Sequence, residues 1–166
     1  MIRHVWFAHG KESGPWGRKI SALAEQARDR GLNVESPDYG FTMDPDERVR
    51  HLLSLRPPVD EGLALVGSSM GGYVAAVASG SLQPDGLFLM APAVDIPGYE
   101  ADTTPRAPVV SVVHGWQDEI IPHDVVYRWS ERHRAPLTLV DAEHALNSRL
   151  DEVSALFENF LDRLQA

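Results

Sequence analysis

The stretch LALVGSSMGGYVAAVASG (residues 63–80) is apolar at both ends and is interrupted in its middle by GSSMG (67–71). The part before the interruption predicts a buried strand, and the small and aliphatic residues after it predict a helix. A serine on a tight strand-to-helix turn is strained and lies clear of the sheet, and flanking glycines remove side chains that would collide with the backbone. The spacing G-x-S-x-G therefore predicts Ser69 as a nucleophile. The competing interpretation is that the glycines only allow close helix–strand packing and the serines cap the helix.

The same alternation of short apolar runs and amphipathic stretches extends to both ends of the chain. Such alternation predicts a mainly parallel sheet with helices on both faces, so we expect one three-layer α/β domain with a six-stranded sheet over residues 1–166. Ligands bind at the carboxyl ends of the strands in such sheets. The expected strands span residues 2–8, 32–37, 62–67, 85–91, 107–115 and 136–140. The expected helices lie within 13–31, from 44 onward, over 70–80, from near Pro122 onward and over 146–164.

Composition excludes several classes of function. The net charge of −9, from 15 basic and 24 acidic residues, argues against nucleic acid or an anionic membrane as a partner. The chain has no cysteine, which excludes disulfides, a thiolate nucleophile and thiolate metal sites. Its start, MIRHVWFAHG, lacks the pattern of a secretory signal, and the uncharged residues 62–84 are too rich in glycine and serine for a membrane helix. We therefore expect a cytoplasmic protein that is a monomer or a homodimer.

A serine nucleophile needs a base that removes its proton, and the base needs a third group that orients it. His144, in DAEHAL (141–146), lies just beyond the last expected strand and before the last helix. It therefore lies at the same edge of the sheet as Ser69. This position makes it the candidate base among seven histidines.

The candidate acid is Asp118, in HGWQDEIIP (114–122), a few residues past the fifth expected strand. Ser69, Asp118 and His144 then occur in the order nucleophile, acid and base, which is one of the known orders of a catalytic triad. Other acidic residues near this edge of the sheet stay alternatives for the acid: first Asp95, past the fourth strand, and then Glu119 and Asp141.

The oxyanion that develops when a serine attacks a carbonyl needs preorganised N–H donors. Met70, directly after the nucleophile at the start of a helix, is expected to supply one donor from its backbone. The other is expected from the loop after the first strand, FAHGKESG (7–14), where the backbone N–H of Lys11 is the candidate and that of Glu12 the alternative. We expect His9 to brace this loop by hydrogen bonding.

Four segments, FAHGKESG, GSSMGG, HGWQDEIIP and DAEHAL, together resemble the oxyanion loop, nucleophile elbow, acid loop and histidine loop of the α/β-hydrolases. The resemblance is to the small bacterial serine esterases and thioesterases without a lid, and it covers essentially the whole chain. It implies a minimal α/β-hydrolase fold that lacks the first two strands and the cap. It also implies Ser69 as nucleophile, Asp118 as acid and His144 as base, with Met70 and Lys11 as oxyanion donors.

Aromatic residues are the candidate substrate-binding side chains: Trp16, Tyr73 and Trp116, with Tyr99 in addition. Residues 92–108 hold four prolines, which prevent the amphipathic helices of a mobile lid. We expect this segment to form a loop over the strand ends.

The function that these features favour is hydrolysis of a small carboxylic ester or an acyl thioester through an acyl-enzyme on Ser69. The alternative is a protein-interaction module that keeps the α/β-hydrolase fold without catalysis. Metal-dependent hydrolysis ranks third, because the chain has no His-x-His or His-Glu-x-x-His spacing. We expect a small-molecule substrate, no metal and no cofactor.

Overall fold

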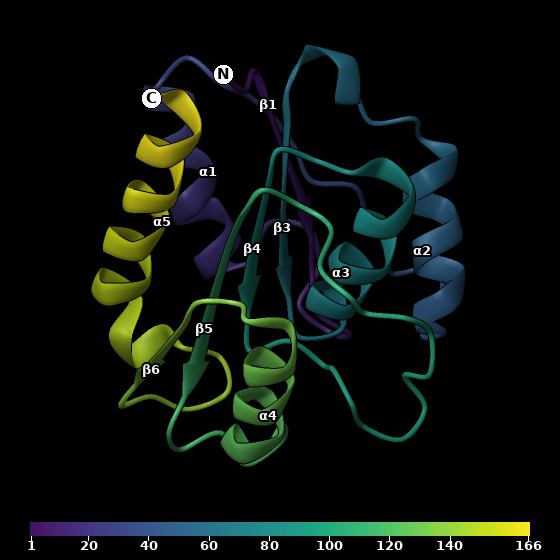
Figure 1. Cartoon of the computed structure of the whole chain (residues 1–166), viewed down its shortest axis with the longest axis vertical. Coiled ribbons are helices and arrows are strands. Elements are labelled where there is room, and N and C mark those ends of the chain that lie inside the picture. Colours follow the sequence, from purple (N-terminus) through teal and green to yellow (C-terminus); the bar gives the residue numbers. More distant parts are fainter.

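A six-stranded, all-parallel sheet lies between two layers of helices in the computed structural model, which describes residues 1–166 (Figure 1). This confirms the expected three-layer α/β architecture. The strands are β1 (His4–Ala8), β2 (Asn33–Glu35), β3 (Leu63–Ser68), β4 (Gly86–Met90), β5 (Val109–Gly115) and β6 (Leu137–Val140). The helices are α1 (Arg18–Asp29), α2 (Pro45–Ser54), α3 (Met70–Leu82), α4 (His123–His133) and α5 (Leu150–Gln165), with short 3-10 helices η1 (Val59–Glu61) and η2 (Asn147–Arg149).

The strand order is β2-β1-β3-β4-β5-β6. The chain adds β2 on one side of β1 and then crosses to add β3 on the other side, so the order reverses between β1 and β3. At such a reversal the loops after two neighbouring strands diverge, which opens a crevice at their carboxyl ends. The loop after β1 and the GSSMG turn after β3 therefore border the same crevice.

Each face of the sheet has its own apolar core because successive side chains of a strand point to opposite faces. Ala64 and Val66 of β3 pack towards α1 and α5, whereas Leu63 and Leu65 pack towards α2, α3 and α4. In Figure 1, α1 and α5 lie together on one side of the strands and α2 and α3 on the other. None of the helices combines the length and the apolar character needed to cross a membrane.

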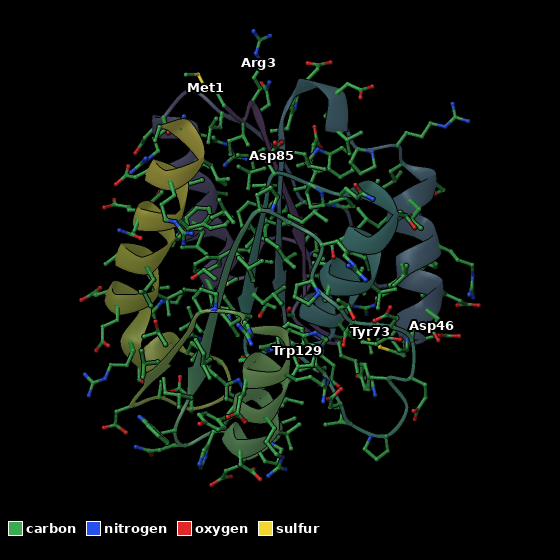
Figure 2. All side chains as sticks on the ribbon, viewed as in Figure 1. Met1, Arg3, Asp46, Tyr73, Asp85 and Trp129 are labelled. Carbon is green, nitrogen blue, oxygen red and sulfur yellow. The ribbon has the colours of Figure 1, made fainter.

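Residues 92–108, between β4 and β5, contain no helix or strand, as expected. Side chains of the two neighbouring helices hold this loop in place. The Tyr73 hydroxyl of α3 accepts from the backbone N–H of Ala101 at 3.0 Å, and the indole N–H of Trp129 in α4 donates to Thr103 Oγ1 at 2.8 Å. Tyr73 also donates to Asp46 Oδ1 at 2.7 Å, and Figure 2 shows these two side chains side by side. These two hydrogen bonds thus hold the loop against α3 and α4.

Candidate active site

Ser69 occupies a sharp turn between β3 and α3. Its backbone has φ 55° and ψ −118°, a conformation that residues other than glycine rarely adopt and that stores strain at functional sites. The turn is possible only with glycine on both sides. A Cβ atom at Gly67 would lie 2.2 Å from the backbone oxygen of Gly71, and one at Gly71 would lie 1.8 Å from the backbone oxygen of Ala8. Close backbone approach therefore explains both glycines.

Three polar side chains from three separate loops form a continuous chain of hydrogen bonds. The Ser69 hydroxyl donates to Nε2 of His144 at 2.9 Å, and Nδ1–H of His144 donates to Asp118 Oδ2 at 2.7 Å. Because the carboxylate accepts from Nδ1, the imidazole presents Nε2 as an acceptor to the serine. The structure thus brings together the nucleophile, base and acid candidates of the sequence.

Asp118 lies in a turn that holds it in its ionised form. Its other oxygen, Oδ1, accepts from the backbone N–H groups of Ile120 and Ile121, each at 2.8 Å. Burial raises the pKa of Asp118, but the hydrogen bonds from His144 and from the two backbone N–H groups outweigh burial, so the net pKa lies below its usual value. A buried carboxylate with these donors is a stable acceptor for the imidazole N–H.

A second histidine borders the same carboxylate. His114 of β5 is fully buried, its Nε2–H donates to the backbone oxygen of Ile121 at 2.8 Å, and Nε2 lies 3.3 Å from Asp118 Oδ2. Burial lowers the pKa of His114, which favours the neutral ring. His114 therefore supports the turn around Asp118 without adding a charge next to it.

None of the alternative acids forms a hydrogen bond or ion pair with the imidazole of His144. The Asp95 carboxylate pairs with Arg132, that of Asp141 accepts from the Gln117 amide, and Glu119 is exposed. Of the four acidic candidates, only Asp118 contacts the candidate base.

The loop after β1 passes beside the serine turn, and His9 braces it as expected. His9 is buried, its Nδ1–H donates to the backbone oxygen of Gly10 at 2.7 Å, and its Nε2 accepts from the backbone N–H of Tyr39 at 2.9 Å. The N–H of Gly10 donates to Ser13 Oγ at 3.1 Å. No group of the protein accepts from the N–H of Lys11, which is consistent with a donor kept free for substrate.

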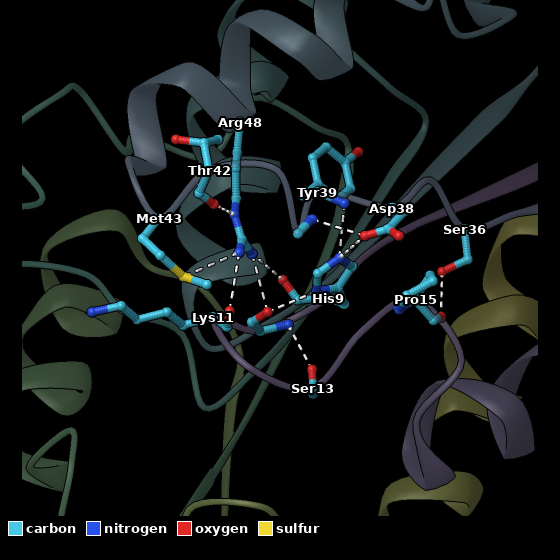
Figure 3. A network of polar contacts seen from close by, with 12 residues as sticks. His9, Lys11, Ser13, Pro15, Ser36, Asp38, Tyr39, Thr42, Met43 and Arg48 are labelled. Atoms are coloured by element: carbon cyan, nitrogen blue, oxygen red, sulfur yellow. Dashed lines mark hydrogen bonds and ion pairs between the residues drawn. The ribbon is translucent and has the colours of Figure 1, made fainter.

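Arg48 is a residue of this site that the sequence analysis did not identify (Figure 3). Its side chain is fully buried beneath the loop after β1. The guanidinium donates to the backbone oxygens of Gly10 at 3.0 Å and of Lys11 at 3.0 Å, and also to that of Thr42 at 2.9 Å. Its planar set of donors therefore fixes the carbonyls of the loop that carries the candidate oxyanion donor.

One signal in the sequence points to this burial. Arg48 lies four residues before Leu52 and directly before Val49 in α2, so it shares the inward stripe of that helix. A charged residue on an apolar stripe is buried only when other groups satisfy its donors. No sequence pattern, however, shows that the acceptors come from a loop almost 40 residues away.

A cavity of about 620 Å³ opens beside Ser69 and His144. Its walls come from the loop after β1, the start of α1, the loop 92–108 and the turns after β5 and β6. Tyr99 is the one aromatic residue of its lining. Trp16, Tyr73 and Trp116, the side chains expected to bind substrate, do not border this cavity.

The three aromatic side chains have other environments. Trp16 lies before α1 on the surface, where the guanidinium of Arg28 stacks 5.1 Å from its ring centroid. Trp116 is exposed and packs edge-on against His123 at 5.0 Å. Tyr73 is fully buried and uses its hydroxyl to hold the loop 92–108. No His, Cys, Asp and Glu side chains are grouped so that three or more could bind a metal ion.

Comparison with solved structures identifies similar proteins over the full length of the chain. A protein from Xanthomonas campestris pv. campestris, named a "putative hydrolase of the alpha/beta superfamily", is 35% identical; the match covers 99% of this chain and 100% of that one, with a TM-score of 0.88. At this identity and coverage the two chains share a family. No protein-family model matches the sequence, and no curated protein matches it either.

Two more distant structures share the fold. A serine hydrolase without a lid from Xanthomonas campestris is 24% identical, over 100% of this chain and 85% of that one, with a TM-score of 0.71. A protein from Butyrivibrio proteoclasticus with ferulic acid bound is 16% identical, over 98% and 89% of the two chains, with a TM-score of 0.82.

Proposed function

This chain belongs to the α/β-hydrolase superfamily, and we propose that it is a serine hydrolase that cleaves a small carboxylic ester or an acyl thioester. The observation that carries the proposal is the hydrogen-bonded chain from Ser69 through His144 to Asp118, at a strained turn beside a cavity. Fold alone does not define a function, so the site supplies the argument.

In the first half of the reaction, Ser69 Oγ attacks the carbonyl carbon of the substrate while its proton moves to Nε2 of His144. Asp118 stabilises the imidazolium that forms and keeps the ring oriented. The backbone N–H groups of Met70 and Lys11, with that of Glu12 as the alternative to Lys11, donate to the developing oxyanion. The carbon–oxygen or carbon–sulfur bond then breaks, and the imidazolium gives its proton to the leaving alcohol or thiol.

In the second half, water hydrolyses the acyl-enzyme. His144 Nε2 takes a proton from the water, whose oxygen attacks the acyl carbon. The tetrahedral intermediate collapses, the bond to Ser69 Oγ breaks, and Oγ recovers a proton from the imidazolium. The product is a carboxylic acid, and no cofactor takes part in these steps.

The test is turnover of a panel of p-nitrophenyl esters and acyl thioesters by the wild-type protein and by Ser69→Ala. We expect measurable ester or thioester hydrolysis in the wild type and its loss in Ser69→Ala. Ser68→Ala is the matched control, because Ser68 lies in the same turn but contacts neither His144 nor Asp118 through a hydrogen bond. A fluorophosphonate probe should label Ser69 alone. Absence of turnover across the panel, with no labelling, would favour the interaction module.

A further inference from the structure

Basic side chains gather at the candidate active site although the protein as a whole carries a net charge of −9. The chain has only two lysines, Lys11 and Lys19, and both line the cavity beside Ser69, together with Arg18. Glu12 is the one acidic residue of the lining. A cleft lined mainly by one sign of charge attracts ligands of the opposite sign.

No carboxylate forms an ion pair with these three cations, although Glu143 and Asp118 act on Lys19 from a greater distance. Neither the two lysines nor Arg18 forms an ion pair within the protein, whereas Arg30, Arg128 and Arg132 each pair with an aspartate. Their charges are therefore available to a ligand in the cavity.

Lys19 is the least exposed of the three. Its ammonium donates to the backbone oxygen of Ala145 at 2.9 Å, next to the candidate base His144. An ammonium has three N–H donors, and this contact uses one of them. Burial lowers the pKa of Lys19 to about 8, although the carboxylates of Glu143 and Asp118 act in the opposite direction. A negative group in the cavity would therefore stabilise the ammonium of Lys19, which has lost much of its hydration.

The start of α1 adds to the positive potential. Residues 17 to 20 line the cavity, and the N-cap, Gly17, has no side chain that could accept from the first N–H groups of the helix. The first turn contains no acidic residue. The positive end of the helix dipole therefore faces the same space as the three cations.

Other parts of the cavity lining are apolar. Ala93 and Ile96 come from the loop 92–108, and Ile120 and Ile121 follow β5. A ligand that fills both parts of the cavity has an apolar body and a negatively charged end.

We propose that the substrate is an ester or thioester that carries an anionic group, bound by Lys19 together with Arg18 and Lys11. This inference rests on the proposed function, and it specifies the substrate class of the same site. The anionic group is a carboxylate on the acyl part or a charged group on the leaving part, and the experiment distinguishes these two sources.

Two matched pairs of substrates test the proposal. Mono-p-nitrophenyl adipate and p-nitrophenyl hexanoate have acyl chains of equal length, but only the adipate is charged. S-butyryl coenzyme A and S-butyryl-N-acetylcysteamine differ in the charge of the leaving thiol. We expect kcat/KM to be about tenfold or more higher for the anionic member of one pair, which also tells which part carries the charge. Equal or lower kcat/KM for the anionic member in both pairs would overturn the proposal.

A double variant, Arg18→Gln with Lys19→Gln, separates anion binding from a structural role of Lys19. If Lys19 only held the loop of His144 through Ala145, the variant would reduce turnover of both members of a pair alike. We expect instead that the ratio of anionic to neutral kcat/KM falls about tenfold. Arg163→Gln is the control, because Arg163 is exposed near the end of α5 and its removal changes the net charge without touching the cavity.

Binding to Ser69→Ala distinguishes failure of this inference from failure of the proposed function. Calorimetry with monomethyl adipate and methyl hexanoate requires no turnover. Tighter binding of the anionic ester, weakened by the double variant, would support the anion site even if no ester were hydrolysed. Turnover of neutral esters with no preference for the anion in binding or catalysis would reject the anion site and leave the hydrolase proposal intact.

Discussion

The guanidinium of Arg48 donates to the backbone oxygen of Lys11 at 3.0 Å, although the two residues lie 37 positions apart in the sequence. This contact joins α2 to the loop after β1, and it holds the peptide unit that carries the Glu12 N–H. A second contact, to the backbone oxygen of Gly10 at 3.0 Å, holds the peptide unit that carries the Lys11 N–H. A backbone N–H contributes to catalysis only when its position is fixed before the oxyanion forms. Arg48 is thus a positioning residue for the candidate oxyanion donor.

Arg48→Lys should lower kcat by about 10- to 100-fold and leave KM nearly unchanged, because an ammonium keeps the charge but loses the planar set of donors. The loss should concern the transition state, in which the oxyanion forms, rather than substrate binding. Steady-state kinetics and the affinity for a boronate that mimics the tetrahedral intermediate measure this split. Arg50→Lys is the control on the exposed side of the same helix. A lower thermal midpoint with normal kcat would show a purely structural role.

Local patterns in the sequence predict the parts of the site that depend on chain order. The strand-to-helix turn at Ser69 follows from glycine spacing, and the meeting of Ser69, Asp118 and His144 follows from the rule that loops after parallel strands share one edge of a sheet. The parallel sheet follows from another pattern, the continuous apolar strands, which are typical of a sheet that helices cover on both faces.

Contacts between distant segments could not be predicted in this way. Tyr73 and Trp116 have similar aromatic character in the sequence, yet one is fully buried and the other exposed, because burial depends on which helix packs against each residue. The acceptors of Arg48 and the position of Lys19 beside Ala145 likewise arise only when α2 and α1 pack against the loops of the sheet. Long-range packing, rather than local propensity, decides these positions.

Asp118→Asn should lower kcat by about 10⁴-fold, because an amide in place of the carboxylate no longer stabilises the imidazolium and favours the wrong ring tautomer. The backbone N–H groups of Ile120 and Ile121 both donate to Oδ1, so the amide keeps its oxygen on these donors and presents its NH2 group to Nδ1 of His144. Pre-steady-state release of p-nitrophenol measures the acylation step directly. The matched variant is Asp95→Asn, which removes the carboxylate that pairs with Arg132 and should leave kcat within about threefold of the wild type. The opposite ranking of the two variants would assign the acid to Asp95.

The preference for an anionic ester should fall as the pH rises through about 8, the pKa to which burial lowers Lys19. A lysine is charged below its pKa, so the attraction is present at lower pH and is lost at higher pH. The ionisable groups around the ammonium are Glu143, Asp118 and His144, and their effects on turnover cancel in the ratio of kcat/KM for adipate and hexanoate esters. This ratio is measured from about pH 6.5 to 9.5, where the adipate carboxylate stays ionised. In Lys19→Gln the ratio should be lower and independent of pH over this range. If the ratio in this variant falls with pH as it does in the wild type, the effect belongs to another group.

Short and medium acyl chains should be the preferred substrates, without a jump in rate at a lipid–water interface. The loop 92–108 contributes Ala93, Ile96 and Tyr99 to the cavity wall, but it has no helix that could swing open, and Tyr73 and Trp129 hold it to α3 and α4. Each methylene that the cavity buries contributes about 0.8 kcal/mol, or about a fourfold gain in kcat/KM, and a methylene outside the cavity contributes almost nothing.

Because the cavity holds only about 620 Å³, kcat/KM for p-nitrophenyl esters should rise with the first methylenes and then level off. The series from about two to sixteen carbons, above and below the critical micelle concentration, measures this profile. A continued rise to the longest chains, or a rate jump at the micelle boundary, would mean that the loop 92–108 moves away from the cavity despite its contacts with Tyr73 and Trp129.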